Sequence, residues 1–431
     1  MKKKRGRSIS RVKKKTKIVN KIEKKELKKA KIVKKEIKNI REYLSVIPYV
    51  RKAISEGYSK GQIKVVLLEK GWPGDYIERA FNEINLGNNR TKTKVSAGSK
   101  YNSSVTSTLA PQVRDFGRKI EALRAEVSKI VVGQEKVVSD LLICLICGGN
   151  ALLEGVPGIA KTLIMNALAK TIGCSSKRIQ FTADLLPTDI TGFVAYSQNK
   201  GFFVVKGPVF ANFVLADEIN RAPPKVQSAL IEVMQERQVT IGKKTYILAK
   251  PFLVMATENP LENRGVYKLP EAQIDRFLFK ILVDYPTTQQ EEVIMDTNIS
   301  IKKFEDYDLK TILSPEQILD MQDLVKQIFI HPKIKHYIAK IVEQTRPKIS
   351  SVEIVKKYVG WGASPRASIN LFIAAKANAL LAGRPFVIPQ DVKDIAYNVL
   401  RHRILLNYQG QIDNIKTEDI ISDVLNKVEV P

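Results

Sequence analysis

One segment constrains the fold of this chain more than any other, because it reads as a strand, a glycine-rich loop and a helix in succession. The apolar run Ala151–Glu154 is followed by GVPGIAKT and then by the helical pattern LIMNALAKTIG. The phosphate-binding loop G-x-x-x-x-G-K-[ST] lies in this position, between a buried strand and a helix. Its backbone N–H groups surround phosphates, and the start of the helix adds positive potential. The segment therefore predicts a nucleotide-binding α/β domain.

The residues of this loop have distinct expected roles. Lys161 would reach the β- and γ-phosphates of ATP, and the Thr162 hydroxyl would bind Mg²⁺. Ala160 stands where the pattern has its second glycine, and alanine is acceptable there if the residue keeps a negative φ, since only a positive φ favours glycine. A plain strand–turn–helix is the alternative reading. The predicted nucleotide-binding loop consists of Gly155, Val156, Pro157, Gly158, Ile159, Ala160, Lys161 and Thr162.

Two later strands would bring acidic and polar side chains to the same place. The apolar run that starts at Ala211 ends in Asp217 and Glu218, and the run that starts at Pro251 leads to Asn259. In a parallel sheet, the functional groups gather at the carboxyl ends of the strands. Asp217 would hold Mg²⁺ through water, and Glu218 would polarise the attacking water. A solvated acidic turn at the end of a strand is the alternative.

The charge of the chain is concentrated at its start. The 431 residues carry a formal net charge of +27, and residues 1–45 alone hold 20 Lys and Arg against 4 Glu. The second part of this tail has an apolar stripe of helical spacing that runs from Val33 to Ile47, with lysines on the other faces. Such a tail could contact nucleic acid, the ribosome or an anionic membrane, or it could simply be solvated.

The rest of the chain divides into four predicted parts. Residues 46–88 read as a small helical module, and the Ser-, Thr-, Asn- and Lys-rich residues 89–112 read as a flexible linker. Residues 113–286 would form the α/β core, and residues 287–431 a helical domain that follows it.

Composition excludes several classes of protein. Three cysteines cannot form a disulfide framework, which favours a reducing compartment. Cys144 and Cys147 are more simply a buried pair on one helix face than a redox motif. The longest uncharged apolar run near them, Leu141–Leu153, is too short to span a bilayer, and no apolar segment of a secretory signal follows the basic N-terminus. We therefore expect a cytoplasmic protein, with peripheral membrane attachment as one role for the tail.

Ile130–Pro286 resembles the core of the MoxR branch of the AAA+ ATPases, and the resemblance continues to about Arg401. The stretch around DEINRAPP is the most specific part, and the family loop commonly reads GVPG-x-AKT, so Ala160 fits it. The matching motifs are VVGQEKVV, LLEGVPGIAKT, GPVFANFVLADEINRAPPKVQSALIEVMQERQVTIG, PFLVMATENP, LPEAQIDRF and GASPRA.

The resemblance implies an αβα AAA+ core with a helical lid, an ATPase activity that uses ATP and Mg²⁺, and a ring, usually a hexamer. It also implies two hairpin insertions, at Asp189–Phe210 and Arg237–Leu248, which either point at a central pore or merely cap the sheet. For the nucleotide site, the resemblance implies that Val132, Gly133 and Gln134 contact the adenine, that Lys161 and Thr162 are the Walker A pair, and that Asp217 and Glu218 are the Walker B pair. It also implies that Asn259 is sensor 1. Arg276 would be an arginine finger acting in trans, and Arg366 would be sensor 2 acting in cis.

MoxR-type proteins act with partners that carry a von Willebrand factor A domain, so the resemblance implies a machine that remodels or matures protein partners. Two alternatives remain, a nucleic-acid-associated motor recruited through the basic tail and a subunit like those of magnesium chelatase. The small helical module and the tail have no counterpart in a minimal MoxR protein.

Overall fold

The computed structural model describes residues 97–155, 160–199, 201–259, 266–297 and 304–431, together with Lys64, Leu67 and Leu68. The chain divides into two units, Met1–Ser103 and Ser104–Pro431. The predictions for the basic tail lie outside the described residues. So do those for the small module, apart from Lys64, Leu67 and Leu68, which are helical, with Leu67 buried.

A five-stranded parallel sheet forms the centre of the second unit, in the order β2-β5-β8-β1-β9. Parallel pairing needs a long crossover between consecutive strands, and helices supply most of these crossovers. The strand order brings β8 between β5 and β1, so the carboxyl ends of all three lie at one edge. The strands are β1 (Ala151–Glu154), β2 (Ser176–Gln180), β5 (Phe213–Asp217), β8 (Leu253–Glu258) and β9 (Phe279–Leu282).

Alternating residues of the strands enter two separate apolar cores, one on each face of the sheet. In β1, Ala151 and Leu153 join the core that contains α4, α5 and α6, whereas Leu152 joins the core that contains α7 and α8. Both faces are covered, as expected of a parallel sheet. The predicted α/β class is confirmed. The helices around the sheet are α4 (Ala97–Val127), α5 (Glu135–Ile146), α6 (Lys161–Ile172), α7 (Pro187–Thr191), α8 (Pro224–Glu236), α9 (Glu271–Ile274) and α10 (Thr288–Thr297), with 3₁₀ turns at Pro208–Phe210, Ile219–Arg221 and Phe304–Tyr307.

Helix α4 differs from what the sequence predicts for residues 89–112. Residues 97–112 are helical and form the first half of α4, whereas the sequence predicts a flexible linker there. Leu109 and Val113 are buried in the core that also contains α5 and α6, and so is Ile120, about two turns after Val113. These apolar contacts extend the helix through a stretch whose composition is typical of linkers.

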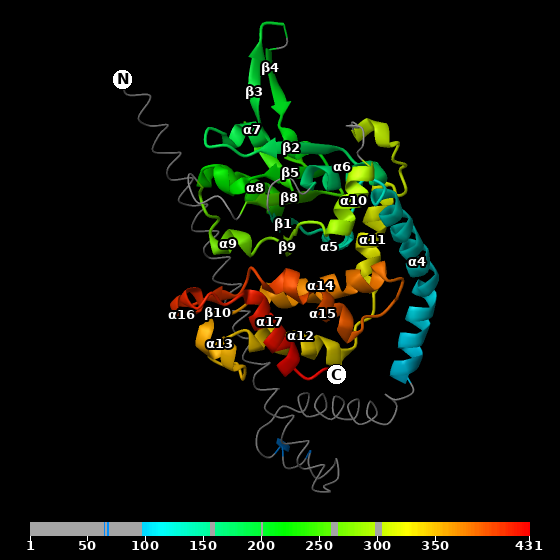
Figure 1. The fold of residues 1–431 in the computed structure, drawn as a ribbon. Helices are drawn as coiled ribbons and strands as arrows, with labels where there is room; N and C mark the ends of the chain where they lie inside the picture. The colour runs from blue at the N-terminus through cyan, green and yellow to red at the C-terminus, as the bar shows by residue number, and fades with distance from the viewer. Residues whose placement is uncertain are drawn as a thin grey trace. The chain divides into compact units, whose positions relative to one another are not determined.

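Two antiparallel hairpins extend from the α/β core at the positions predicted for the insertions. Strands β3 (Gly192–Ser197) and β4 (Gly201–Lys206) form the first, which projects from the sheet in Figure 1. Strands β6 (Gln238–Ile241) and β7 (Lys244–Ile247) form the second. Gly192 has φ +99°, and a Cβ there would lie 2.2 Å from the Val205 carbonyl oxygen, so the base of the first hairpin requires glycine.

The C-terminal part is a helical lid with one short antiparallel pair, β10 (Val359–Trp361) and β11 (Leu405–Leu406). Several of its helices begin with proline, the residue favoured at the first helical position; before Pro315 and Pro365, Ser314 and Ser364 cap the helix with their side chains. The lid helices are α11 (Pro315–Gln327), α12 (Pro332–Gln344), α13 (Glu353–Tyr358), α14 (Pro365–Leu381), α15 (Pro389–Leu400), α16 (Tyr408–Ile412) and α17 (Thr417–Lys427). The predicted helical lid is confirmed; the boundary at residue 287 stays a prediction.

Candidate active site

Lys161 lies at the start of α6, directly after the loop that leaves β1. Its ammonium donates a hydrogen bond to the Gly155 carbonyl at 2.6 Å, so the side chain points back toward the end of β1. Burial lowers the pKa of Lys161, and the nearby Asp217, Glu218 and Glu154 oppose this shift. Thr162 follows in the first turn of α6 and is partly buried. Val156, Pro157, Gly158 and Ile159 lie outside the described residues.

Ala160 does not have the backbone conformation that alanine favours. It has φ +56° and ψ +21°, so it adopts the left-handed conformation and does not meet the condition of a negative φ under which alanine is readily accepted here. A Cβ in this region costs roughly 1 kcal/mol relative to glycine. Ala160 therefore adopts a backbone conformation that glycine would adopt without this cost.

Asp217 ends β5 and uses both carboxylate oxygens. The Thr257 hydroxyl donates to Asp217 Oδ1 at 2.6 Å, and the Arg178 guanidinium contacts Oδ2 at 2.6 Å and 3.1 Å. Thr257 belongs to the neighbouring strand β8, and Arg178 to β2 on the other side. The order of the sheet therefore fixes the orientation of this carboxylate from both sides.

Glu218 follows at once in a left-handed conformation, with φ +57° and ψ +50°. Such a conformation is uncommon outside glycine and is often retained at functional sites. The Glu218 N–H donates to the Thr257 hydroxyl at 2.9 Å, while its Oε2 accepts from Gln180 Nε2 at 2.5 Å and pairs with Arg221 at 3.1 Å. The carboxylate is thus held beside Asp217 and turned toward the end of β2.

Three residues that contact Asp217 or Glu218 were not identified from the sequence: Arg178, Gln180 and Thr257. Each lies near the carboxyl end of β2 or β8, the strands that flank β5. Thr257 lies near the end of the apolar strand β8, which is a signal in the sequence. Strand β2 is mostly polar and exposed, so only the strand order identifies Arg178 and Gln180 as neighbours of β5. Asn259, predicted from the sequence, is buried directly after β8.

The segment predicted to border adenine precedes α5. The Gln134 side chain donates to the Asp284 carbonyl at 3.0 Å, which ties this segment to the chain after β9. Gly133 has φ +77°, and a Cβ there would lie 2.8 Å from the Gln290 side chain. Val132 and Gly133 are partly exposed.

Arg276 and Arg366, the two arginines predicted for the site, both lie near the contact between the core and the lid. Arg276 is exposed in the loop between α9 and β9, and no interaction of its side chain with another described residue is observed. Arg366, in the first turn of α14, contacts the Asp275 carboxylate at 2.7 Å. Asp275 directly precedes Arg276, so the structure brings Arg366 to the loop that carries Arg276.

Magnesium is the metal whose preferences fit these residues. Hard cations favour carboxylate, hydroxyl and water oxygens. Asp217 offers a carboxylate and Thr162 a hydroxyl, and both lie near Lys161, Asp217 close enough to affect its pKa and Thr162 as the next residue. Within the described ranges, no group of three or more His, Cys, Asp or Glu side chains is arranged to hold a metal ion. Burial raises the pKa of both Cys144 and Cys147, which makes them poor thiolate ligands.

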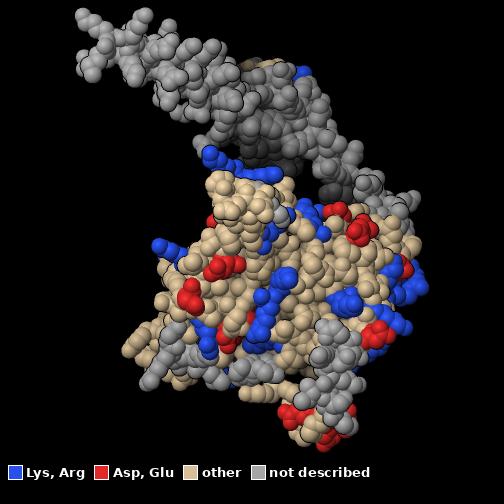
Figure 2. All heavy atoms as spheres, turned by 90° about the horizontal axis from the view of Figure 1, so that it is seen from above, with Lys and Arg blue, Asp and Glu red and all other residues tan. Residues whose placement is uncertain are grey.

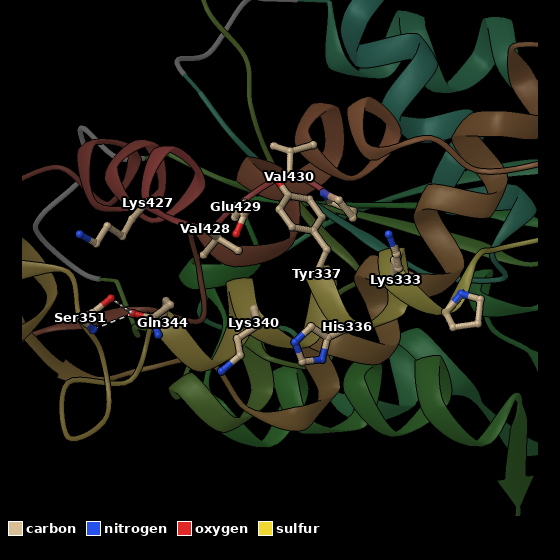
Figure 3. A pocket seen from close by; sticks show the side chains of 12 residues that line it. Lys333, His336, Tyr337, Lys340, Gln344, Ser351, Lys427, Val428, Glu429 and Val430 are labelled. Carbon is tan, nitrogen blue, oxygen red and sulfur yellow. Dashed lines mark hydrogen bonds between the residues drawn. The ribbon is translucent and has the colours of Figure 1, made fainter. Parts of the chain in front are cut away.

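A separate hollow lies in the lid (Figure 3). It has a volume of about 670 Å³ between one face of α12 and the chain after α17. Lys333, His336 and Lys340 line it along α12, and the buried Tyr337 lies among them. The Tyr337 hydroxyl has no hydrogen-bond partner in the described part of the chain.

The parallel sheet, the lysine at the start of α6 and the paired acids at the end of β5 together define a P-loop nucleoside triphosphatase with a helical lid. Residues 150–279 match the family described as "ATPase family associated with various cellular activities (AAA)", and residues 352–424 match the AAA lid domain.

Known proteins place the chain more closely. It is 48% identical to Chaperone MoxR1 of Mycobacterium tuberculosis over 326 residues, which cover 75% of this chain and 84% of that protein. It is 42% identical to the uncharacterized protein YeaC of Bacillus subtilis, over 73% of this chain and 95% of YeaC. A crystal structure of a putative ATPase from Cytophaga hutchinsonii is 46% identical, with a TM-score of 0.71, over 75% of this chain and 98% of that one. The chain belongs to the MoxR family of AAA+ ATPases, and it binds and hydrolyses ATP.

Proposed function

We propose that this ATPase assembles as a ring, as a hexamer in the usual family form, and uses ATP hydrolysis to remodel or mature a protein partner that carries a von Willebrand factor A domain. The observation that carries the proposal is the group formed by Lys161, Asp217 and Glu218 at one edge of the sheet, oriented by Thr257. The name of the relative Chaperone MoxR1 supports a chaperone-like role.

The roles of the individual residues follow from their chemistry. ATP with Mg²⁺ supplies the triphosphate and its charge-neutralising cation. The backbone of residues 155–160 and Lys161 would bind the phosphates, Thr162 and Asp217 would hold Mg²⁺, and Glu218 would orient and polarise the attacking water. Val132, Gly133 and Gln134 would border the adenine. The Gln180 and Arg221 contacts to Glu218 would have to loosen before that carboxylate could meet a water.

Three further polar residues would complete the reaction centre. The buried Asn259 would contact the water or the γ-phosphate. The exposed guanidinium of Arg276 would act on ATP bound by the neighbouring subunit, which is why hydrolysis would need a ring. Arg366 would leave Asp275 and contact the γ-phosphate within its own subunit when ATP binds.

The β3–β4 hairpin is the element best suited to contact a client. It exposes aromatic side chains on both strands, with Tyr196 66% and Phe202 80% exposed. Their rings pair across the hairpin with centroids 5.1 Å apart. Exposed aromatic groups are typical binding anchors, so we place this hairpin at the pore.

The alternative, a nucleic-acid-associated motor, depends on the basic tail. In Figure 2, which views the molecule from the hairpin end, Lys and Arg side chains of the described residues are interspersed with Asp and Glu over this face. A nucleic-acid channel would favour a continuous basic groove with aromatic groups along it. The tail would then serve to recruit the ATPase to nucleic acid, the ribosome or an anionic membrane. A role like that of a magnesium-chelatase subunit is a further alternative. None of the described helices is long and apolar enough to cross a membrane.

A trap variant tests the proposed function. Glu218→Gln should bind ATP but hydrolyse it slowly, and so retain its partner during affinity purification from nuclease-treated lysate. We expect a von Willebrand A-domain protein to be retained with or without residues 1–45, and Lys161→Ala to lose it. The proposal would be contradicted if no protein partner were retained and if, in a parallel purification without nuclease, only the chain with residues 1–45 retained nucleic acid. That result would favour the nucleic-acid-associated motor.

A further inference from the structure

The loop that carries Arg276 is held from the lid. Arg276 lies between α9 and β9, in a short connection that has no regular backbone pairing of its own. Its guanidinium is exposed, so its direction depends on the backbone on either side. Turn hydrogen bonds from the Arg276 and Phe277 N–H groups to Gln273 and Ile274 hold part of this backbone, and His402 Nε2 lies 3.3 Å from the Phe277 carbonyl. The largest set of side-chain contacts to it comes from Arg403, which lies more than 120 residues later, after α15.

Arg403 contacts the chain on both sides of Arg276. Its Nη2 donates to the Asp275 carbonyl at 3.0 Å and to the Phe277 carbonyl at 2.6 Å, the two carbonyls that flank Arg276. Its Nε donates to Asp275 Oδ1 at 2.8 Å. Its Nη1 donates to the Leu278 carbonyl at 3.3 Å and also to the carbonyl of Val399 in α15. One guanidinium therefore fixes the loop against the end of α15.

Arg403 is a charged side chain buried in the protein, and burial of a charge costs free energy. Packing alone therefore does not explain its position. The Arg403 side chain is 1% exposed, and the Asp275 side chain is 22% exposed. Burial lowers the pKa of Arg403 to about 10, and Asp275 opposes that shift, so the group stays charged at neutral pH. Replacing a buried ion pair with apolar groups is often neutral or stabilising, so stability is a weak reason for such a pair. A fixed, planar fork of donors is suited to holding several acceptors in one geometry.

Arg401 offers a natural comparison within the same segment. It contacts Glu418 at 2.8 Å, and its Nη1 donates to the Lys280 carbonyl at 2.8 Å. It thus also ties the lid to the core, but at β9 and not at the loop of Arg276.

We propose that Arg403 is a positioning residue for the arginine finger: its buried guanidinium clamps the backbone on both sides of Arg276 and so presents that side chain to the nucleotide of the neighbouring subunit. This inference rests on the proposed function, because it requires Arg276 to act in trans. It assigns the lid a role in the donor subunit, in addition to any role in the subunit's own nucleotide site.

A mixing experiment separates the donor and acceptor roles of one subunit. Full-length Lys161→Ala cannot use ATP but keeps Arg276, whereas Arg276→Ala binds ATP but lacks the finger. Mixing the two should restore hydrolysis at junctions where Arg276 of the first faces ATP in the second. Arg403→Lys is then added to either partner; lysine keeps the charge but has at most three donors on a single nitrogen, so it cannot span both flanking carbonyls and the carboxylate.

When mixed with Arg276→Ala, the donor Lys161→Ala/Arg403→Lys should give an ATPase rate at least about tenfold below that obtained with the donor Lys161→Ala. Small displacements of a catalytic group lower the rate by about this factor or more. When the acceptor is Arg276→Ala/Arg403→Lys and the donor is Lys161→Ala, the ATPase rate should lie within about twofold of the reference mixture. This result would also show that the Arg403→Lys variant folds and assembles. Lys161→Ala/Arg401→Lys should restore activity like Lys161→Ala alone.

Three results would overturn the inference. Full restoration by the Arg403→Lys donor would mean that the clamp is not needed. Equal loss when Arg403→Lys is in the donor and in the acceptor would mean that it acts on folding or on the lid in general. Failure of the reference mixture of Lys161→Ala and Arg276→Ala would refute the finger in trans itself, and this result is read before any Arg403 variant is added.

Discussion

At the scale of single residues, Thr257 shows how one hydroxyl can organise two carboxylate-bearing residues. It donates to Asp217 and accepts from the backbone of Glu218, and it is 1% exposed. Asp217 would otherwise be oriented by Arg178 alone, and the backbone N–H of Glu218 would lack this acceptor. The distance between the two acids is thus set from a neighbouring strand.

Thr257→Val keeps the shape of this side chain and removes both hydrogen bonds. A buried group left unpaired costs about 1–3 kcal/mol, so we expect kcat to fall by at least about tenfold while the KM for ATP changes by less than about threefold. Steady-state ATPase kinetics measure both. Thr171→Val is the matched control, because the Thr171 hydroxyl is also buried but bonds only to carbonyls within α6. A similar loss in both variants would indicate a general effect of the lost hydroxyl.

Asp140 predicts a dependence of stability on pH. It is buried on α5, and burial raises its pKa to about 6, opposed by Lys136, Asn398 and Arg401. Between its ordinary pKa of 3.8 and about 6, the folded state binds more protons than the unfolded state, so stability falls as pH rises through this window. The cost above pH 6 is about 3 kcal/mol, from about 1.4 kcal/mol for each pKa unit.

Asp140→Asn should therefore stabilise the protein at pH 7.5 by up to about 3 kcal/mol, and by about half as much at pH 5. Urea unfolding curves of both proteins at the two pH values test this. An equal shift at both pH values, or a loss of stability, would show that the buried charge carries no such cost.

Single residues also show how far the sequence could lead. Lys161, Asp217 and Glu218 were predictable because a loop or a strand end identifies each of them within a few residues of chain. Arg178, Thr257 and Arg403 act through contacts with residues 39 or more positions away, and only the strand order and the packing of the lid bring them there. Ala160 matches the family loop, but its positive φ could not be read from the sequence, because a residue type does not fix its backbone conformation.

At the scale of elements, the β3–β4 hairpin carries the most direct prediction about the client. Tyr196→Ser/Phe202→Ser, made in the Glu218→Gln background, removes two exposed anchors, and we expect client retention to fall by at least about tenfold. Trp361→Ser in the same background is the control, because Trp361 is 76% exposed but belongs to the lid. Quantitative pull-down measures retention, and an unchanged yield from the hairpin variant would remove the hairpin from the client-binding surface.

The elements themselves were largely predictable from patterns of apolar residues. The strands β1, β5 and β8 and both hairpins follow apolar runs and turn residues that are local in the chain. Helix α4 was not predicted before residue 113, because Ser, Thr and Asn are typical of linkers and the helix depends on packing by Leu109 and Val113. Tertiary contacts overrode composition at that element.

At the scale of the whole molecule, hydrolysis should depend on assembly. If Arg276 acts only on a neighbour's ATP, the rate per subunit should fall on dilution in step with the loss of the ring, as measured by sedimentation. Arg276→Ala should lower kcat by about 10³-fold, the range known for arginine fingers, at concentrations where the ring is intact. A constant rate per subunit in a fully monomeric sample would contradict the trans mechanism.

The apolar core on the α4–α6 side of the sheet continues without a break into the lid. Phe279 of β9, Leu141 of α5 and Leu371 of α14 all belong to it. The chain between residues 286 and 315 therefore joins two parts that share one interior and are not independent modules. An engineer who wished to exchange lids between relatives, or to graft this ATPase core onto another protein, would have to transplant the facing side chains of α5 and β9 together with the lid.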